Sequence, residues 1–162
     1  MVLMDQYTRH IIGFAVHPGT LDGISICVLF NKIISGSKLP KYLSSDNDPI
    51  FQFYRWKANL RILDIEEIKS LPYIPMSHPF VERLIRICRN ELLDRVIFWN
   101  ETDLQRKLDL YQHYFNEHRT HMGINGKIPL QIAENKNVNI INIKNYSWKS
   151  FCHGLFQLPI AA

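Results

Sequence analysis

The chain has 162 residues, of which 46% are hydrophobic, and this composition suits one soluble domain with a sizeable core. No apolar run approaches the length that a membrane span needs, so we exclude an integral membrane protein. The formal net charge of +4 permits a polyanionic partner but does not by itself require one.

The first residues and the cysteines favour an intracellular chain. The N-terminus reaches Asp5 too early for a secretory signal peptide. The three cysteines, Cys27, Cys88 and Cys152, are far apart and odd in number, so they match neither a zinc spacing nor a disulfide framework. We therefore interpret them as reduced packing residues and expect the protein in the cytoplasm.

The N-terminal part of the chain predicts a strand and then a helix. Residues 10–17 form a short apolar run, which is typical of a buried strand. Residues 20–35 predict a helix with Thr20 as its N-cap and Gly36 as its stop. Its expected apolar stripe is formed by Leu21, Ile24 and Val28.

The next segment predicts two strands around a helical stretch. Residues 41–45 predict a short strand with Asp46 at its tip, and a helical segment follows from Pro49. Residues 60–65 alternate enough to predict another strand. The proline-containing stretch 71–78 predicts an exposed loop.

Two strongly patterned helices follow the loop. The first spans residues 79–93 with Pro79 at its first position, and we expect it to bury Val81, Leu84, Ile85, Cys88 and Leu92. The second spans about residues 101–116 after the N-cap Asn100, with a stripe formed by Leu104, Leu108, Tyr111 and Phe115. Strands that alternate with helices indicate an α/β fold.

Two acidic residues, Asp46 and Glu82, lie in contexts that suit metal ligands. Asp46 follows a predicted strand and Glu82 lies in the first turn of a predicted helix, where α/β folds place their sites. Carboxylate oxygens are ligands that Mg²⁺ prefers, and paired metal ions promote in-line displacement at phosphorus. Each acid also has a structural interpretation, Asp46 as a turn residue and Glu82 as an acid that the helix dipole stabilises.

Several short motifs occur in a recognisable order. They are Asp5-Gln6-Tyr7-Thr8-Arg9 followed by Ile12-Gly13-Phe14, Ser45-Asp46-Asn47 with Phe51, Pro79 with Glu82, and Tyr114-Phe115-Asn116 with Arg119, His121 and Pro129. With 35 residues between Asp46 and Glu82, this order resembles the catalytic core of the retroviral-integrase superfamily, in particular bacterial insertion-sequence transposases of the D-D-35-E type. The resemblance covers residues 1–132 and leaves 133–162 as a C-terminal tail.

The resemblance implies an RNase H-like fold, with a mixed sheet and flanking helices. It implies that Asp46 and Glu82 are catalytic residues that bind Mg²⁺ or Mn²⁺, and that the activity is DNA integration or transposition by strand nicking and strand transfer. Basic residues on the glutamate-bearing helix grip DNA phosphates in similar proteins, so Arg86 and Arg89 are expected to bind DNA. These two arginines also have a structural interpretation, as a solvated helix face.

Two positions depart from the family pattern. Asp48 stands where the family has glycine, which adds negative charge near the site and puts an acid where a positive φ would be less well tolerated. The family's first catalytic aspartate lies on a strand upstream of the segment that begins at Asp5, so we interpret Asp5 as a turn residue or as an ion-pair partner of Arg9. We therefore expect a chain that lacks the first strand, and that is impaired or works with an upstream transposase fragment.

Alternatives to catalysis by this chain stay open. A non-catalytic remnant would keep DNA binding and self-association and would act as an inhibitor or have no activity, whereas an RNase H-like nuclease of another class would cleave RNA or junctions. The expected partners are element ends and target DNA, met at the nucleoid, and further copies of the chain.

The polar residues near the end of the second long helix receive mainly structural interpretations. Asn116, Arg119 and His121 match a family motif and are interpreted as structural residues or peripheral DNA contacts. A zinc site formed by His113, His118 and His121 has little support, because no cysteine stands at zinc-finger spacing. The apolar C-terminal segment is expected to pack on the core or to pair with another subunit.

Overall fold

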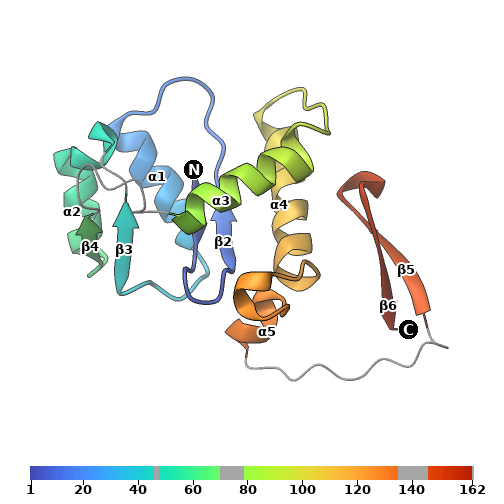
Figure 1. Ribbon diagram of the computed structural model, residues 1–162. Coiled ribbons are helices and arrows are strands. Elements are labelled where there is room, and N and C mark those ends of the chain that lie inside the picture. Colours follow the sequence, from blue (N-terminus) through green and yellow to red (C-terminus); the bar gives the residue numbers. More distant parts are fainter. Residues whose placement is uncertain (46–47, 70–78, 135–145, 162) are drawn as a thin grey trace.

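The computed structural model describes residues 1–45, 48–69, 79–134 and 146–161 (Figure 1). Within them the strands pair two by two into three small sheets, one parallel and two antiparallel, and helices flank these pairs. The α/β class is confirmed, with the strands divided among short pairs in place of one continuous mixed sheet. In this part of the chain, no helix is both long enough and apolar enough to cross a bilayer.

The first two strands form an antiparallel hairpin against a helix. Strand β1 (Val2–Met4) pairs with β2 (Ile11–Phe14), so the strand expected here is confirmed in a shorter form. Helix α1 (Gly23–Ile34) packs directly on β2. Gly13 permits this close approach, because a Cβ at that position would lie 2.8 Å from Cγ2 of Ile33.

Helix α1 begins later than expected and buries a different face. The side chain of Asp22 accepts a hydrogen bond from the backbone nitrogen of Ser25 at 2.7 Å, so Asp22 and not Thr20 is the N-cap. The expected stripe was wrong, because Leu21, Ile24 and Val28 are all exposed. The buried residues are instead Gly23, Ile26, Leu29, Phe30, Ile33 and Ile34. Gly36 has a φ of +83° and is confirmed as the stop.

A parallel strand pair lies beside α1. Strand β3 (Tyr42–Ser45) leads into a 3₁₀ turn (Pro49–Gln52) and helix α2 (Tyr54–Ile62), and β4 (Glu66–Lys69) then returns alongside β3. The strand and the helical segment expected here are confirmed. The connection through a helix is the one that parallel neighbouring strands require.

The strand expected over residues 60–65 is wrong, because this stretch is a helix end. Asp64 adopts a φ of +55° and its backbone nitrogen donates to the carbonyl of Arg61. The backbone nitrogen of Ile65 donates to the carbonyl of Leu60 at 2.9 Å, which completes a Schellman motif. Leu60 and Ile65 are both buried. The alternation of apolar and polar residues over 60–65 therefore reflects the capped C-terminal end of α2 and not a strand.

Helices α1 and α2 share one apolar cluster, whose buried members are Ile26, Phe30, Ile34, Trp56, Leu60 and Ile65. Trp56 is 1% exposed, and its ring meets that of Phe30 edge-on at a centroid distance of 5.1 Å. The Trp56 indole donates to Oε1 of Glu67 at 3.2 Å. This bond connects strand β4 to the buried cluster.

The two long helices are confirmed. Helix α3 (Pro79–Cys88) continues into a π-helical turn (Arg89–Leu93), and helix α4 (Glu101–Glu117) follows. The side chain of Asn100 accepts a hydrogen bond from the backbone nitrogen of Asp103 at 2.9 Å, which confirms the predicted cap.

The faces predicted for these helices are mostly confirmed. Leu108, Tyr111 and Phe115 of α4 are buried, and Leu104 packs against them. In α3, Leu84 and Cys88 are buried as expected, as is Leu92 in the following turn. Ile85 was wrongly expected in the core, because it is 46% exposed.

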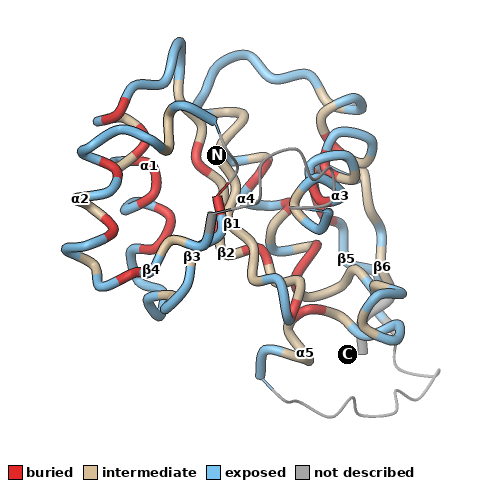
Figure 2. Tube along the Cα trace, turned by 60° about the vertical axis from the view of Figure 1, so that its left-hand side comes forward, coloured by how far each residue is buried: buried red, intermediate tan, exposed pale blue. Residues whose placement is uncertain are grey.

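The C-terminal hairpin packs on α4 as part of the second apolar cluster. Its strands are β5 (Tyr146–Phe151) and β6 (Phe156–Ala161), and Figure 2 shows buried residues along α4 and into this region. The buried members are Ile11, Leu84, Cys88, Leu92, Leu108, Tyr111, Phe115, Phe151 and Cys152. A short helix, α5 (Pro129–Ala133), lies against α4 before the hairpin.

The packing interpretation of the cysteines is confirmed for the two that lie in this cluster. Burial raises the pKa of the Cys88 and Cys152 thiols to about 11. Both therefore stay protonated at neutral pH and behave as small apolar side chains. Cys27 is half-buried, and its thiol donates to the carbonyl of Gly23.

Candidate functional site

Glu82 lies in the first turn of α3 with its side chain exposed to solvent. Leu84 and Cys88, on the other side of the helix, are buried and fix α3 on the core. No described residue forms an ion pair with the Glu82 carboxylate. The carboxylate therefore faces solvent at the N-terminal end of α3, where the helix dipole attracts negatively charged groups and bound anions.

Asp46 lies outside the described residues, so its distance from Glu82 stays a prediction. The strand that precedes it is held firmly. The hydroxyl of Ser45, the last residue of β3, donates to Oε1 of Glu67 at 2.7 Å. The same oxygen accepts the Trp56 indole, so the end of β3 is connected to the buried core.

Asp48 caps the 3₁₀ turn, because its side chain accepts a hydrogen bond from the backbone nitrogen of Ile50 at 2.9 Å. Its φ is −58° and its ψ is 134°, values that any residue adopts without strain. The expected difficulty with a positive φ at this position was therefore wrong. The additional negative charge remains, because the side chain is exposed.

Asp5 forms the turn between β1 and β2. One carboxylate oxygen accepts a hydrogen bond from the backbone nitrogen of Tyr7 at 2.9 Å, and the other accepts from the hydroxyl of Thr8 at 2.7 Å. Its carbonyl accepts from the backbone nitrogen of Arg9 at 2.9 Å. The interpretation of Asp5 as a turn residue is confirmed, and both of its carboxylate oxygens serve that turn.

Arg9 connects this turn to the start of α3. Its guanidinium carbon lies 3.3 Å from the ring centroid of Phe80, which is the geometry of a cation–π contact. Arg9 also donates to the carbonyl of Gln6. Because Phe80 and Glu82 belong to the same helical turn, Arg9 helps to place the turn that carries the glutamate.

Arg86 and Arg89 lie four and seven residues after Glu82 and are exposed. Residues at these spacings share one side of an α-helix. No described residue forms an ion pair with either arginine. Their predicted contact with DNA phosphates is compatible with this exposure and stays a prediction.

Asn116 has a structural role, because it bonds α4 to β2. This side chain is 5% exposed, accepts a hydrogen bond from the backbone nitrogen of Ile11 at 2.8 Å and donates to the Ile11 carbonyl at 2.9 Å. Gln112 also donates to the Ile11 carbonyl, and Gln105 donates to the carbonyl of Phe14. Amides of α4 thus satisfy backbone groups along β2, as a neighbouring strand would.

Arg119 and His121 are structural as well. Arg119 binds both oxygens of Glu91, at 2.8 Å from Nη2 to Oε1 and 3.0 Å from Nε to Oε2, and the Tyr111 hydroxyl donates to the same carboxylate. Nη1 of Arg119 lies 3.1 Å from Nδ1 of His121. Burial, and then the Arg119 cation, lower the pKa of His121 to about 4, so its ring is neutral.

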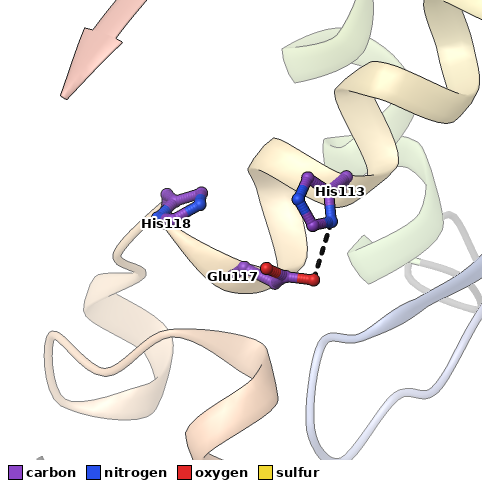
Figure 3. A group of neighbouring side chains, drawn as sticks. All are labelled: His113, Glu117 and His118. Carbon is purple, nitrogen blue, oxygen red and sulfur yellow. Dashed lines mark ion pairs between the residues drawn. The ribbon is translucent and has the colours of Figure 1, made fainter. Parts of the chain in front are cut away.

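The structure brings together His113, Glu117 and His118 at the C-terminal end of α4 (Figure 3). His121 does not join them, because its ring packs against Phe115 at a centroid distance of 4.4 Å. The sequence reasoning considered the three histidines and missed Glu117. The available signal was its spacing of four residues from His113, which puts both side chains on one face of a helix.

Comparisons with known proteins identify the fold. Residues 63–129 match a family model described as the integrase core domain. No curated protein matches the chain. Among solved structures, the catalytic core domain of BIV integrase superposes with a TM-score of 0.63 at 21% identity, over 83% of this chain and 84% of that chain.

Two further structures are similar. A chain of the simian T-cell lymphotropic virus intasome, in complex with a PP2A regulatory subunit, superposes with a TM-score of 0.69 at 16% identity, over 91% of this chain and 54% of that one. The HTLV-2 integrase catalytic core domain in complex with magnesium, in its dimeric form, gives a TM-score of 0.62 at 18% identity over 81% of each chain. The similarity therefore extends over most of the chain and concerns its fold.

Proposed function

Because residues 63–129 match the integrase core domain model and the fold resembles that of retroviral integrase cores, we propose that this chain acts on DNA as a metal-dependent polynucleotidyl transferase. Strand nicking and strand transfer, the steps of DNA integration and transposition, are the proposed reactions. The observation that carries the proposal is the exposed Glu82 in the first turn of α3, within the segment that matches the family model.

Asp46 and Glu82 are the proposed ligands of Mg²⁺ or Mn²⁺. The Glu82 carboxylate suits such an ion, since it offers oxygen donors, is exposed, and has no ion-pair partner among the described residues. When bound, the ion stabilises negative charge on the phosphate oxygens during in-line displacement. The magnesium complex of the HTLV-2 core supports this choice of metal.

The rest of α3 is proposed to position the DNA. Arg86 and Arg89 project from the helix that carries Glu82, and each guanidinium offers paired donors to phosphate oxygens. The contact between Arg9 and Phe80 restrains the start of α3 relative to the β1–β2 turn. The carboxylate and the arginines then keep a fixed spacing along the bound backbone.

A second candidate is a DNA-binding chain that does not cleave, in which the catalytic step is impaired. The observation in its favour concerns Asp5, whose two carboxylate oxygens are both used within the β1–β2 turn. These bonds hold the Asp5 carboxylate in its turn and disfavour it as a third acidic ligand beside Asp46 and Glu82. This candidate predicts DNA binding through α3 without nicking by the chain alone.

Glu82→Gln separates the two candidates in an assay of supercoiled plasmid nicking with MgCl₂ or MnCl₂. If the chain is catalytic, the variant should lose nicking by at least about 100-fold, as expected when stabilisation of transition-state charge is removed. Glu101→Gln is the matched control, since Glu101 is also an exposed acid in the first turn of a helix, and it should nick at the unmodified rate.

Nicking that Glu82→Gln leaves unchanged would contradict the assignment of Glu82. Plasmid binding by the unmodified chain with no nicking in either metal would favour the non-cleaving candidate. Self-association is a further proposal, supported by the dimeric and trimeric forms described for the HTLV-2 core, and sedimentation velocity of the chain would measure it.

A further inference from the structure

The C-terminal end of α4 carries a cluster of metal-ligand side chains, His113, Glu117 and His118 (Figure 3). One donor atom from each residue lies within 4.8 Å of the other two. We propose that this cluster binds a zinc-class divalent ion, independently of the metal proposed at Asp46 and Glu82.

Backbone geometry explains how these three side chains meet. His113 and Glu117 are four residues apart on α4, and Nδ1 of His113 lies 2.7 Å from Oε1 of Glu117. His118, five residues after His113, would point to another side if the helix continued. It is the C-cap, with a φ of −131° and a ψ of −26°, and this departure from helical geometry brings its ring beside the pair.

The surroundings of His118 favour a ligand role. Its Nε2 is buried and has no hydrogen-bond partner among the described residues, and a buried polar atom of this kind calls for an explanation such as a bound ion. Its ring lies 4.4 Å from that of Phe151 in β5, which shields one side of the cluster from water.

The donor set selects zinc over magnesium. Two imidazoles and one carboxylate bind Zn²⁺ in sites that keep a fourth position open. Mg²⁺ prefers oxygen ligands in octahedral geometry, so it is not expected to compete here. The side chains of His113 and Glu117 are 46% and 37% exposed, so they have room to move closer together around a bound ion.

A bound ion would also restrain a junction in the fold. His118 lies at the point where α4 ends, and it packs against the β5–β6 hairpin through Phe151. A ligand that fixes His118 to His113 and Glu117 therefore fixes the last turn of α4 beside the hairpin. We expect zinc to raise the melting temperature of the chain and magnesium at the same concentration to leave it unchanged.

The test is titration of the tag-free, chelator-treated full chain with ZnCl₂ in the presence of excess MgCl₂, followed by calorimetry. The unmodified chain should bind one Zn²⁺, and His113→Gln and His118→Gln should each weaken binding by at least about tenfold. His153→Asn is the matched control, because it removes an exposed histidine outside the cluster, at a positive φ that asparagine tolerates. Its affinity for zinc should equal that of the unmodified chain.

Circular dichroism should show that His113→Gln is folded, since that side chain is exposed. Absence of zinc binding by the unmodified chain would overturn the proposal. So would equal affinity in the folded His113→Gln variant, or displacement of zinc by MgCl₂. A Co²⁺ complex with thiolate charge-transfer absorption would also overturn it, because it would assign the ion to cysteines.

Discussion

Helices α3 and α4 use their polar side chains in different ways. On α4, Gln105 and Asn116 bond to the backbone of β2, so polar groups hold the helix to the sheet. On α3 and the π-helical turn that continues it, Glu82, Arg86 and Arg89 are exposed, and no described residue forms an ion pair with them. The amides of α4 therefore contribute to folding, whereas the exposed side chains of α3 are available to a ligand.

The largest effect on stability is expected for Asn116→Ala. This change leaves the backbone nitrogen of Ile11 without its buried amide partner, whereas the Ile11 carbonyl keeps the hydrogen bond from Gln112. An unsatisfied buried group costs roughly 1–3 kcal/mol and a lost hydrogen bond about 0.5–1.5 kcal/mol, so we expect the free energy of unfolding to fall by about 2–4 kcal/mol. Urea unfolding followed by circular dichroism measures this difference.

Asn31→Ala is the control for that experiment. Asn31 forms its amide bonds with Asn59 at the surface, so its loss should change the free energy of unfolding by less than about 0.5 kcal/mol. Equal destabilisation by Asn31→Ala and Asn116→Ala would remove the distinction between a structural α4 amide and a surface amide.

A smaller effect is expected from the titration of His121. Burial and Arg119 lower the pKa of His121 from 6.5 to about 4, so the folded state takes up its proton less readily than the unfolded state. Its stabilising contribution is therefore complete above pH 6.5 and is lost as the pH falls from 6.5 towards 4. Because the ring is only partly buried, we expect a loss of about 1 kcal/mol.

The measurement compares urea unfolding midpoints at pH 7 and pH 4.5 for the unmodified chain, His121→Gln and His153→Asn. His121→Gln should reduce the pH dependence, and His153→Asn should retain it because His153 is exposed. A pH dependence that is identical in all three proteins would exclude the packing of neutral His121 against Arg119 as its source.

The smallest effect on stability is expected for the double substitution Arg86→Ala with Arg89→Ala. Because both side chains are exposed, the free energy of unfolding should change by less than about 0.5 kcal/mol. DNA binding should weaken, and the slope of log affinity against log salt should decrease by about 1.8, at about 0.9 for each lost phosphate contact. Fluorescence anisotropy of a labelled duplex at several salt concentrations measures that slope.

The matched control removes the same charge from another helix. Arg55→Ala with Arg61→Ala takes two exposed arginines from α2 and should leave the salt slope near its original value. If both double variants reduce the slope equally, DNA recognises the overall charge of the chain, and α3 has no special role.

Local sequence patterns predicted α4 well and α1 poorly, for a physical reason. In α4, the cap Asn100 and the stripe through Leu108 and Tyr111 stand out against polar neighbours. Helix α1 has apolar residues on most of its surface, so periodicity does not select a face. Packing on Gly13 of β2 makes that selection, and this contact lies far away in the sequence.

The two candidate metal sites also differ in how far the sequence predicts them. Glu82 was predicted from its helical context and from a family resemblance, and both are visible in the local sequence. The proximity of Glu117 and His118 depends on the backbone angles at the end of α4, and no residue type in the sequence predicts those angles. Asp64 is a comparable case, because a positive φ at a residue other than glycine ends α2 without a sequence signal.

The position of Phe151 and Cys152 in the same buried cluster as Tyr111 affects how this protein can be divided. A fragment that stops at residue 132 would still contain the whole stretch that matches the family model. It would nevertheless expose an apolar surface along α4, and large exposed apolar surfaces promote aggregation. Any shortened version prepared for crystallisation should therefore retain the final hairpin.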